Sequence, residues 1–184
     1  MDKRKEANMR VKERITTALL RLLENKSISE VSVSEIIAGA GVARASFYRN
    51  YATKESVLTT LISDVLEEFR KDLQSDGENF YTYENVRKSF EFFSRYGNQV
   101  VDLHRFGYGS LLLEMLNQFH EAVAGSMPYQ SMERYQLYIY IGSLYNTAMM
   151  WLKGGQKERT EDVSDMFYRH CAVRDINLVN KNDT

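Results

Sequence analysis

Apolar residues in the first part of the chain recur at the spacing of one helix face. Between about residues 5 and 24 they stand three and four apart, as on the buried stripe of an amphipathic helix. These positions are Val11, Ile15, Ala18, Leu19, Leu22 and Leu23. Two shorter segments follow, over about 33–41 and 42–51, and a longer apolar stripe runs from about residue 54. The pattern therefore predicts four helices before residue 75.

The two short helices are joined by a tight corner. Ser32 and Glu35 have the spacing of a capping box, in which each side chain binds a backbone N–H at the start of the helix. Gly41 stands where the residue after a helix adopts the left-handed conformation, which costs glycine little. The chain resumes as a helix at Val42, and Thr53 can cap the fourth helix. Two short helices joined in this way predict a helix-turn-helix.

Helical spacing continues through the rest of the sequence. Segments over about 84–96, 109–124 and 132–153 each carry an apolar stripe, and Thr160 supplies a cap for a last helix ahead of two acidic residues. The sequence contains no alternating apolar and polar run that would predict a strand. We therefore expect an all-α fold of about nine helices.

A polar run over residues 75–79 is the best boundary within the chain. We expect a head over 1–54, a fourth helix over 54–74 that connects it, and a body over 75–184. Residues 1–54 hold eleven Lys and Arg against six Asp and Glu, whereas residues 55–184 hold thirteen against nineteen. A basic head on an acidic body is expected when one end meets a polyanion, although scattered surface charge produces the same imbalance.

The composition favours a soluble protein of the cytoplasm. A single proline, Pro128, suits long uninterrupted helices. Cys171 is the only cysteine, so no intrachain disulfide can form, which fits a reducing compartment. No stretch reaches the roughly 20 apolar residues that span a bilayer, and the N-terminus shows no apolar region of a secretory signal. We expect no membrane partner.

The second helix of the corner has the properties of a DNA-recognition helix. It is short, begins with a cation, and is mostly polar along one side. Phe47 and Tyr51, four residues apart, can anchor its inner side on the neighbouring helices. The remaining side chains would face outward, toward a major groove whose width admits an α-helix. They are Arg44, Ala45, Ser46, Tyr48 and Arg49.

The run SVSEIIAGAGVARASFYRNYATKE, over residues 32–55, resembles the DNA-binding signature of the tetracycline-repressor (TetR) family. The corner that ends in Ala-Gly-Val, the aromatic helix and the Lys-Glu start of the fourth helix occur in register, and the resemblance covers about the first 60 residues. Three positions depart from the family pattern. Ala43 replaces a capping Ser or Thr, Tyr51 replaces the commoner Phe, and Ala52 replaces a frequent Pro. None of these changes removes a group that would face the groove.

The resemblance implies roles for individual residues. Tyr48 would donate its hydroxyl to a phosphate, and Lys54 would reach another phosphate beside the start of the fourth helix. Arg44 and Ser46 would lie nearest the base edges. The alternative for these positions is a packing aromatic and solvated surface charges. The predicted DNA-binding residues are Ser32, Arg44, Ala45, Ser46, Tyr48, Arg49 and Lys54.

In this family two long helices of each subunit pair into a four-helix bundle, so the resemblance also implies a homodimer. The predicted interface comprises Leu137, Ile141, Leu144, Ala148, Trp151, Val163, Met166, Phe167 and His170. A seam of this kind packs equally well inside one subunit. The aromatic body suggests a mostly apolar effector pocket, although core packing explains most of its aromatic residues. The predicted pocket residues are Phe90, Phe93, His104, Phe106, Tyr108, Phe119, Tyr138 and Tyr145.

The expected function is therefore that of a transcriptional repressor which binds a palindromic operator as a homodimer. A small apolar or aromatic effector that tilts the fourth helix would move the two heads out of register and release the DNA. The alternatives are a helical dimerisation or scaffold protein without an effector response, and an enzyme. Motifs of hydrolases, phosphate-binding loops and metalloproteases are absent, and the three histidines lack metal-ligand spacing. We predict no catalytic residue, metal or cofactor.

Overall fold

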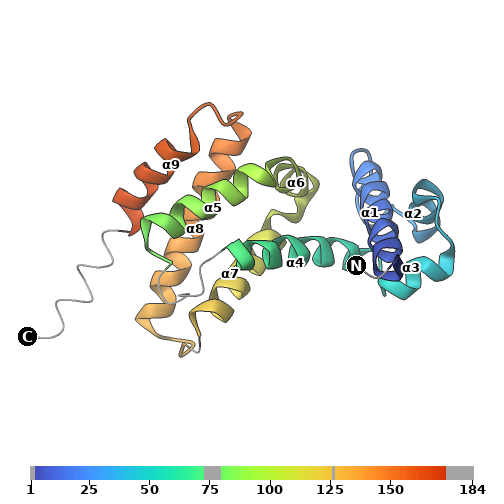
Figure 1. Ribbon diagram of the computed structural model, residues 1–184, viewed down its shortest axis with the longest axis horizontal. Helices are drawn as coiled ribbons and strands as arrows, with labels where there is room; N and C mark the ends of the chain where they lie inside the picture. Colours follow the sequence, from blue (N-terminus) through green and yellow to red (C-terminus); the bar gives the residue numbers. More distant parts are fainter. Residues whose placement is uncertain (1–2, 73–79, 126, 173–184) are drawn as a thin grey trace, which may run out of the picture. The chain divides into compact units, whose positions relative to one another are not determined.

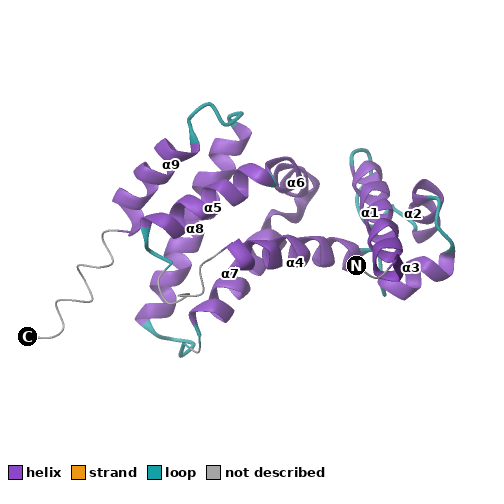
Figure 2. Cartoon of the chain, viewed as in Figure 1, coloured by secondary structure: helices purple, strands orange, loops and turns teal. Residues whose placement is uncertain are grey.

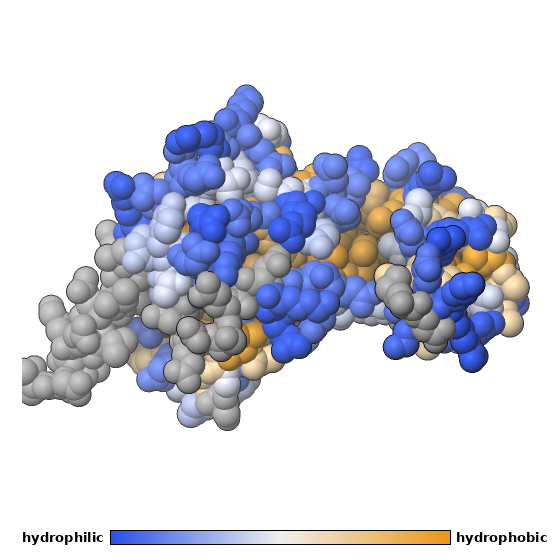
Figure 3. Space-filling model, viewed as in Figure 1, coloured by the Kyte–Doolittle hydropathy of each residue, from blue (hydrophilic) through white to orange (hydrophobic). Residues whose placement is uncertain are grey.

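The computed structural model describes residues 3–72, 80–125 and 127–172. Over these residues the chain forms nine α-helices and two π-helical turns, and no β-strand (Figure 2). The predicted all-α fold is confirmed. None of the helices in this part of the chain combines the length and the apolar composition that crossing a membrane requires. Hydrophilic residues cover much of the visible surface (Figure 3).

The chain divides into two compact units, Met1–Asp64 and Val65–Thr184, and the division falls inside α4 (Glu55–Asp72). The polar run over 75–79, predicted as the boundary, lies outside the described residues. The first unit holds α1 (Lys3–Leu23), α2 (Val33–Ala40), α3 (Arg44–Asn50) and the start of α4 (Figure 1). Its core consists of side chains that are at most 1% exposed. They are Ile15, Leu19, Val31, Ile36, Phe47, Val57 and Leu58.

The ends of the short helices are set by the predicted local interactions. The Ser32 hydroxyl accepts a hydrogen bond from the Glu35 amide at 3.2 Å, and the Glu35 carboxylate accepts one from the Ser32 amide at 2.8 Å. Gly41 ends α2 with a φ of 59°, in the left-handed region. At the start of α4, the Thr53 hydroxyl accepts from the Ser56 amide at 3.1 Å. The capping box, the glycine corner and the Thr53 cap are therefore confirmed.

The second unit holds the end of α4 and five further α-helices. These are α5 (Tyr83–Arg95), α6 (Gly97–Leu103), α7 (Gly109–Ala124), α8 (Met132–Lys153) and α9 (Thr160–Phe167). A π-helical turn, His104–Tyr108, joins α6 to α7, and Gly107 within it has a φ of 89°. The sequence pattern predicts α7 and α8 with these bounds but does not reveal α6, because seven residues are too few to show a helical period.

Aromatic rings hold α5, α8 and α9 together. Phe90 of α5 meets Trp151 of α8 edge-on at 6.0 Å between ring centroids, and Phe167 of α9 at 5.6 Å. Phe167 also meets Tyr140 of α8 at 5.6 Å. Edge-to-face contacts at these distances add to the stabilisation from burial. The aromatic content of the body is therefore used largely for its core.

Seven of the nine side chains predicted for the dimer interface are buried within the single chain. These seven side chains are less than 7% exposed and pack against the chain's own helices. They are Leu137, Ile141, Leu144, Ala148, Trp151, Val163 and Phe167. Met166 and His170 are exposed. The seam packs inside one subunit, where α8 covers α5 and its neighbours, and its part in a dimer stays a prediction.

The start of the last helix also differs from the prediction. Thr160 is the first helical residue, and the N-cap is Arg159, whose side chain makes no capping hydrogen bond. The Arg159 guanidinium instead pairs with Asp162 at 2.8 Å. The predicted cap at Thr160 is therefore wrong by one position, and an ion pair stands where a hydroxyl cap was expected.

A histidine lies in the core of the second unit. His120 of α7 is 1% exposed, and its ring lies 4.9 Å from the ring of Phe80. Its Nδ1 is 2.8 Å from the carbonyl oxygen of Leu116, one turn earlier in the helix. Burial disfavours the charged ring and lowers the pKa of His120 to about 4, although the hydrogen bond to Leu116 acts in the opposite direction. His120 is therefore a neutral core residue at pH 7.

Candidate nucleic-acid interface

Helix α3 has one face buried in the first unit and one face exposed. Phe47 is fully buried and Tyr51 is 4% exposed, and their rings lie 5.9 Å apart. Burial raises the pKa of the Tyr51 phenol. These two aromatics fix the rotation of the helix about its axis. The opposite face is exposed at Arg44, Ala45, Tyr48 and Arg49, while Ser46 is half-buried.

Arg44 and Tyr48, one turn apart on this face, contact each other. The Arg44 Nη2 donates to the Tyr48 hydroxyl oxygen at 3.4 Å, and the guanidinium carbon lies 5.5 Å from the centre of the Tyr48 ring. Tyr48 is 48% exposed, and its hydroxyl hydrogen remains available to donate to another acceptor. The pair therefore presents a cation and a phenol side by side, a combination suited to phosphate and base-edge acceptors.

The start of α3 lacks a side-chain cap, as the substitution at Ala43 predicts. The Ala43 carbonyl accepts from the amides of Ser46 and Phe47, at 2.8 and 3.2 Å, and so begins the helix with backbone bonds alone. Further along, the Asn50 side-chain amide donates to the Ser46 carbonyl at 2.9 Å. The helix is therefore held by its two buried aromatics and by backbone bonds, with its exposed side chains left outside that framework.

Lys54 is bound within its own unit. Its ammonium donates to the Val31 carbonyl at 2.6 Å and to the Ser29 carbonyl at 3.2 Å. These bonds join the start of α4 to the turn that precedes α2, more than 20 residues away in sequence. An ammonium has three N–H donors, so one remains for an outside acceptor. The structure places Lys54 first as a link between two segments of the head.

Ser32 is exposed, but its hydroxyl is occupied by the capping box. It also donates to the Glu35 carboxylate at 2.8 Å. Glu35 accepts from Lys26 as well, and the bonds from Lys26 and Ser32 lower the pKa of Glu35 to about 2. The carboxylate is therefore ionised at neutral pH and keeps this local network intact. Ser32 contributes chiefly to the position of α2.

The eight predicted pocket residues make contacts in different parts of the second unit. Phe90 and Phe93 are core residues, and the Phe119 ring lies 5.6 Å from that of Phe69. The Tyr145 hydroxyl donates to the Gly109 carbonyl at 3.2 Å. His104 lies beside Lys153, and the Phe106 ring lies under the Arg105 guanidinium. Tyr108 is half-buried, and Tyr138 is exposed on the surface.

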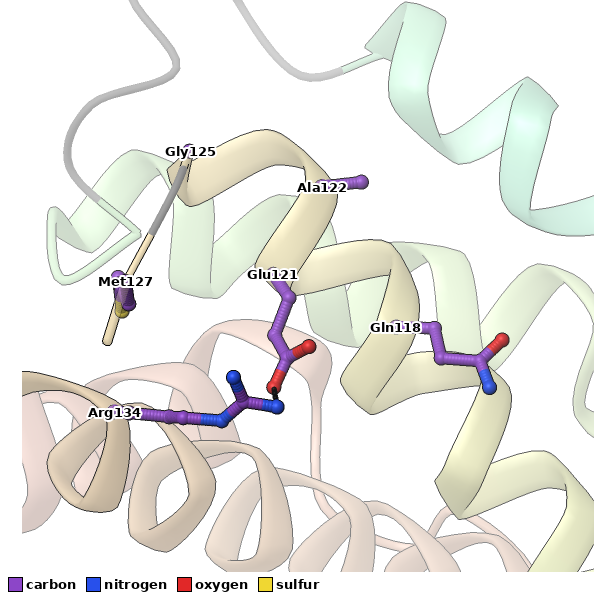
Figure 4. A pocket seen from close by; sticks show the side chains of 6 residues that line it. All are labelled: Gln118, Glu121, Ala122, Gly125, Met127 and Arg134. Atoms are coloured by element: carbon purple, nitrogen blue, oxygen red, sulfur yellow. Dashed lines mark ion pairs between the residues drawn. The ribbon is translucent and has the colours of Figure 1, made fainter. Parts of the chain in front are cut away.

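Two hollows of the second unit are lined by other residues. One, of about 380 Å³, lies between α7 and α8, where Arg134 reaches across to Glu121 at 2.6 Å (Figure 4). The other, of about 630 Å³, is bordered by the C-terminal part of α8 and by α9, with Met150 and Met166 in its lining. Neither lining includes any of the eight predicted pocket residues.

A surface that the sequence analysis missed runs along the outside of α8. We call it the α8 outer stripe, and its members are Met132, Tyr135, Ile139, Gly142, Asn146 and Met150. It carries no charge, and Ile139 and Met150 are 68% and 78% exposed. The sequence does indicate this second face, because its positions are also separated by three or four residues. Since α8 is apolar on two faces, the period alone does not say which face is buried.

Comparison with known proteins gives one family match. Residues 15–61 match the family described as bacterial regulatory proteins, tetR family. The regulator EthR of Mycobacterium tuberculosis is 38% identical over 58 residues, which cover 32% of this chain and 27% of EthR. EthR of Mycolicibacterium smegmatis is 29% identical over 110 residues, which cover 58% of this chain and 49% of that protein. The chain thus matches about a quarter to a half of the length of these relatives.

Solved structures share the fold along most of the chain. A TetR transcriptional regulator from Streptococcus agalactiae has a TM-score of 0.57 at 20% identity, covering 92% of this chain and 97% of that one. The fatty acid degradation regulator FadR from Bacillus halodurans has a TM-score of 0.55 at 17% identity, covering 86% and 93%. Residues 15–61 therefore match the tetR family of bacterial regulatory proteins, and the chain as a whole has the fold of these solved regulators.

Proposed function

We propose that this protein is a DNA-binding transcriptional repressor that binds a palindromic operator as a homodimer and is released by a small-molecule effector. The observation that carries the proposal is the exposed polar face of α3, held outward by the buried Phe47 and Tyr51. A helix of this size fits the major groove, and side chains on its outer face reach base edges there. The proposal assigns the chain no catalytic step.

On this proposal the side chains of the head divide into two groups. Arg44 and Ser46 face base edges, where a guanidinium pairs with the two acceptors of guanine. The hydroxyl of Tyr48 and the remaining N–H of Lys54 bind phosphates, which set the register of the protein without reading sequence. Arg49 adds charge at the rim. The contact between Arg44 and Tyr48 supports a shared role, because it places the two groups side by side on the exposed face of α3.

The experiment is a selection of DNA fragments from a random pool with the purified full chain, followed by binding to the selected duplex at several salt concentrations. The expected result is a palindrome whose half-sites are about 10 base pairs, or a multiple of one helical turn, apart. Affinity should fall steeply as salt rises. A protein that selects no sequence and ignores duplex DNA at about 50 mM salt would instead be a helical dimerisation or scaffold protein.

For the homodimer we propose that the α8 outer stripe meets the same stripe of a second copy. An uncharged face with exposed Ile139 and Met150 is the kind of surface that a partner covers. A two-fold axis brings the same residues of both copies together. Gly142 lies in the middle of the stripe, and a Cβ added there would meet no atom within 4 Å, so two helices can cross closely at this point. The exposed Met166 of α9 would extend the contact.

For the effector we propose a small apolar or aromatic molecule bound in the second unit. The aromatic residues of α5 to α8 support this chemistry, and the eight predicted pocket residues stay a prediction. A ligand releases DNA only to the extent that it binds the released state more tightly than the bound one. Titrating labelled operator with and without a panel of such compounds tests this, and unchanged affinity at saturation by a bound compound would exclude release.

A further inference from the structure

Arg14 of α1 is bound to the corner of the helix-turn-helix. Its Nη2 donates to the carbonyl oxygen of Gly41 at 2.9 Å, across 27 residues of sequence. A Cβ built on Gly41 would lie 2.6 Å from the same nitrogen, so the guanidinium lies directly against the corner. A guanidinium that donates to a carbonyl makes a charge-assisted bond, which is stronger than a neutral one.

The Gly41 carbonyl lies at the point where α2 ends and the chain turns toward α3. The amides of Gly41 and Val42 close α2 by donating to the carbonyls of Ala38 and Ile37, each at 3.2 Å. The Gly41 carbonyl itself lies past the last helical residue, at the negative end of the α2 dipole, where a cation is favoured. Arg44 begins α3 three residues later. The orientation of the Gly41–Val42 peptide therefore bears directly on the direction of α3.

We infer that Arg14 is a positioning residue for DNA binding, which holds the corner from α1 so that α3 presents its exposed face in one orientation. The inference rests on the proposed function. Arg14 acts through the corner and touches no DNA. Its role therefore differs from that of a phosphate contact, which adds affinity for every sequence and steepens the salt dependence.

Arg21 provides a matched control. Arg10, Arg14 and Arg21 lie on one side of α1, and all three line a hollow of about 540 Å³ that also borders residues 38–41, at the end of α2 and the corner. Arg10 already pairs with Glu6 at 2.7 Å. Changing Arg14 or Arg21 to Ala removes the same charge from the same side of the same helix. A general attraction between this basic side and DNA would therefore respond equally to both changes.

The test compares Arg14→Ala, Arg14→Lys and Arg21→Ala with the unaltered full chain. The probes are a duplex selected by the unaltered protein from random DNA and a random-sequence duplex of the same length. Arg14→Ala should lower affinity for the selected duplex about five- to tenfold more than Arg21→Ala does. Both variants should bind the random duplex alike, and the salt slope of Arg14→Ala should match that of Arg21→Ala. Arg14→Lys, which keeps a donor and the charge, should recover part of the loss.

Hydrogen exchange gives a readout that does not need DNA. Amides of the corner, at residues 41–44, should exchange faster in Arg14→Ala than in Arg21→Ala, with the protection of α1 unchanged. Equal affinities in the two alanine variants, or a salt slope about one unit shallower in Arg14→Ala alone, would overturn the positioning role. If the unaltered protein prefers no duplex, the proposed function fails and this role fails with it. If the unaltered protein prefers the selected duplex but the two alanine variants bind it with equal affinity, only the proposed role of Arg14 fails.

Discussion

Lys54 has two partners inside its own unit, although the resemblance assigns it to a phosphate. Its bonds to the Ser29 and Val31 carbonyls link the start of α4 to the turn before α2. His120 is a second ionisable residue whose surroundings set its role, because burial in the apolar core keeps its ring neutral. In both cases the surroundings of the side chain, rather than its type, decide what it does.

Changing Lys54 to Ala should therefore have two measurable effects. The free energy of unfolding should fall by about 1–3 kcal/mol, because two carbonyls lose a charged donor. The slope of log affinity against log salt should also become shallower by about one, if the third N–H binds a phosphate. Urea unfolding and salt-dependent DNA binding measure the two effects. Lys5→Ala, which removes the same charge from an exposed position of α1, is the control; unchanged stability in Lys54→Ala would contradict the link.

Lowering the pH should destabilise the protein through His120. The pKa of His120 is about 4 in the folded chain, against an ordinary value of 6.5, so only the unfolded chain takes up the proton between these values. Stability is fully present above about pH 6.5 and is lost as the pH falls toward 4. Between pH 7 and pH 5 the loss should be about 2 kcal/mol. Denaturant unfolding at several pH values should show this loss of stability in the unaltered protein and not in His120→Gln. If the free energy of unfolding falls equally with pH in both proteins, His120 is not the cause.

At the scale of elements, the corner between α2 and α3 depends on one glycine. Gly41 combines a left-handed φ of 59° with the close approach of Arg14, so a side chain there meets both backbone strain and a steric conflict. Gly39, two residues earlier, lies in α2, and a Cβ added to it would meet the Ala18 Cβ at an ordinary 3.4 Å. The two glycines are close in sequence, but only Gly41 is needed for its backbone conformation.

Alanine at these two positions should therefore have opposite effects. Gly41→Ala should destabilise the head by about 1–2 kcal/mol, the cost of a left-handed conformation with a Cβ. Gly39→Ala should leave stability unchanged or raise it by up to about 1 kcal/mol, because alanine loses less backbone entropy in a helix. Urea midpoints of the two variants measured side by side check this. If Gly41→Ala has the same urea midpoint as the unaltered protein, the corner can adopt another conformation at no cost in stability.

At the scale of the whole molecule, the outside of α8 is an uncharged surface that the described part of the chain leaves exposed. Its inner face is used by the core, as the burial of Leu137, Ile141 and Leu144 shows. The α8 outer stripe is available to a second copy, and a palindromic operator requires two heads. Dimerisation and operator binding are therefore coupled in the proposed function.

Placing a charge in the stripe should separate the subunits. Ile139→Glu brings two carboxylates together at a two-fold interface and leaves them without water, which costs several kcal/mol. Sedimentation should show a monomer, and affinity for the palindrome should fall by at least about a hundredfold, because each head then binds alone. Asn98→Glu, at an exposed position of α6, adds the same charge as a control. A dimer that survives Ile139→Glu would place the interface elsewhere.

Much of the fold could be predicted because it depends on neighbours in sequence. The capping box at Ser32, the left-handed Gly41 and the bounds of α7 and α8 follow from interactions between residues up to about five apart. The exposed side of α3 follows in the same way, since Phe47 and Tyr51 mark its inner face. The buried face of α8 could not be predicted, because α8 has two apolar faces and its period is the same on both.

The sequence by itself thus determined that the protein is helical, where most helices begin and end, and that a tetR-type helix-turn-helix lies near its N-terminus. Only the tertiary structure decided which face of α8 is buried, that Lys54 binds the carbonyls of Ser29 and Val31, and that Arg14 holds Gly41. The physical reason is the distance along the sequence over which each interaction acts. Helix ends depend on hydrogen bonds within a turn or two, whereas these three features depend on segments that meet only when the chain has packed.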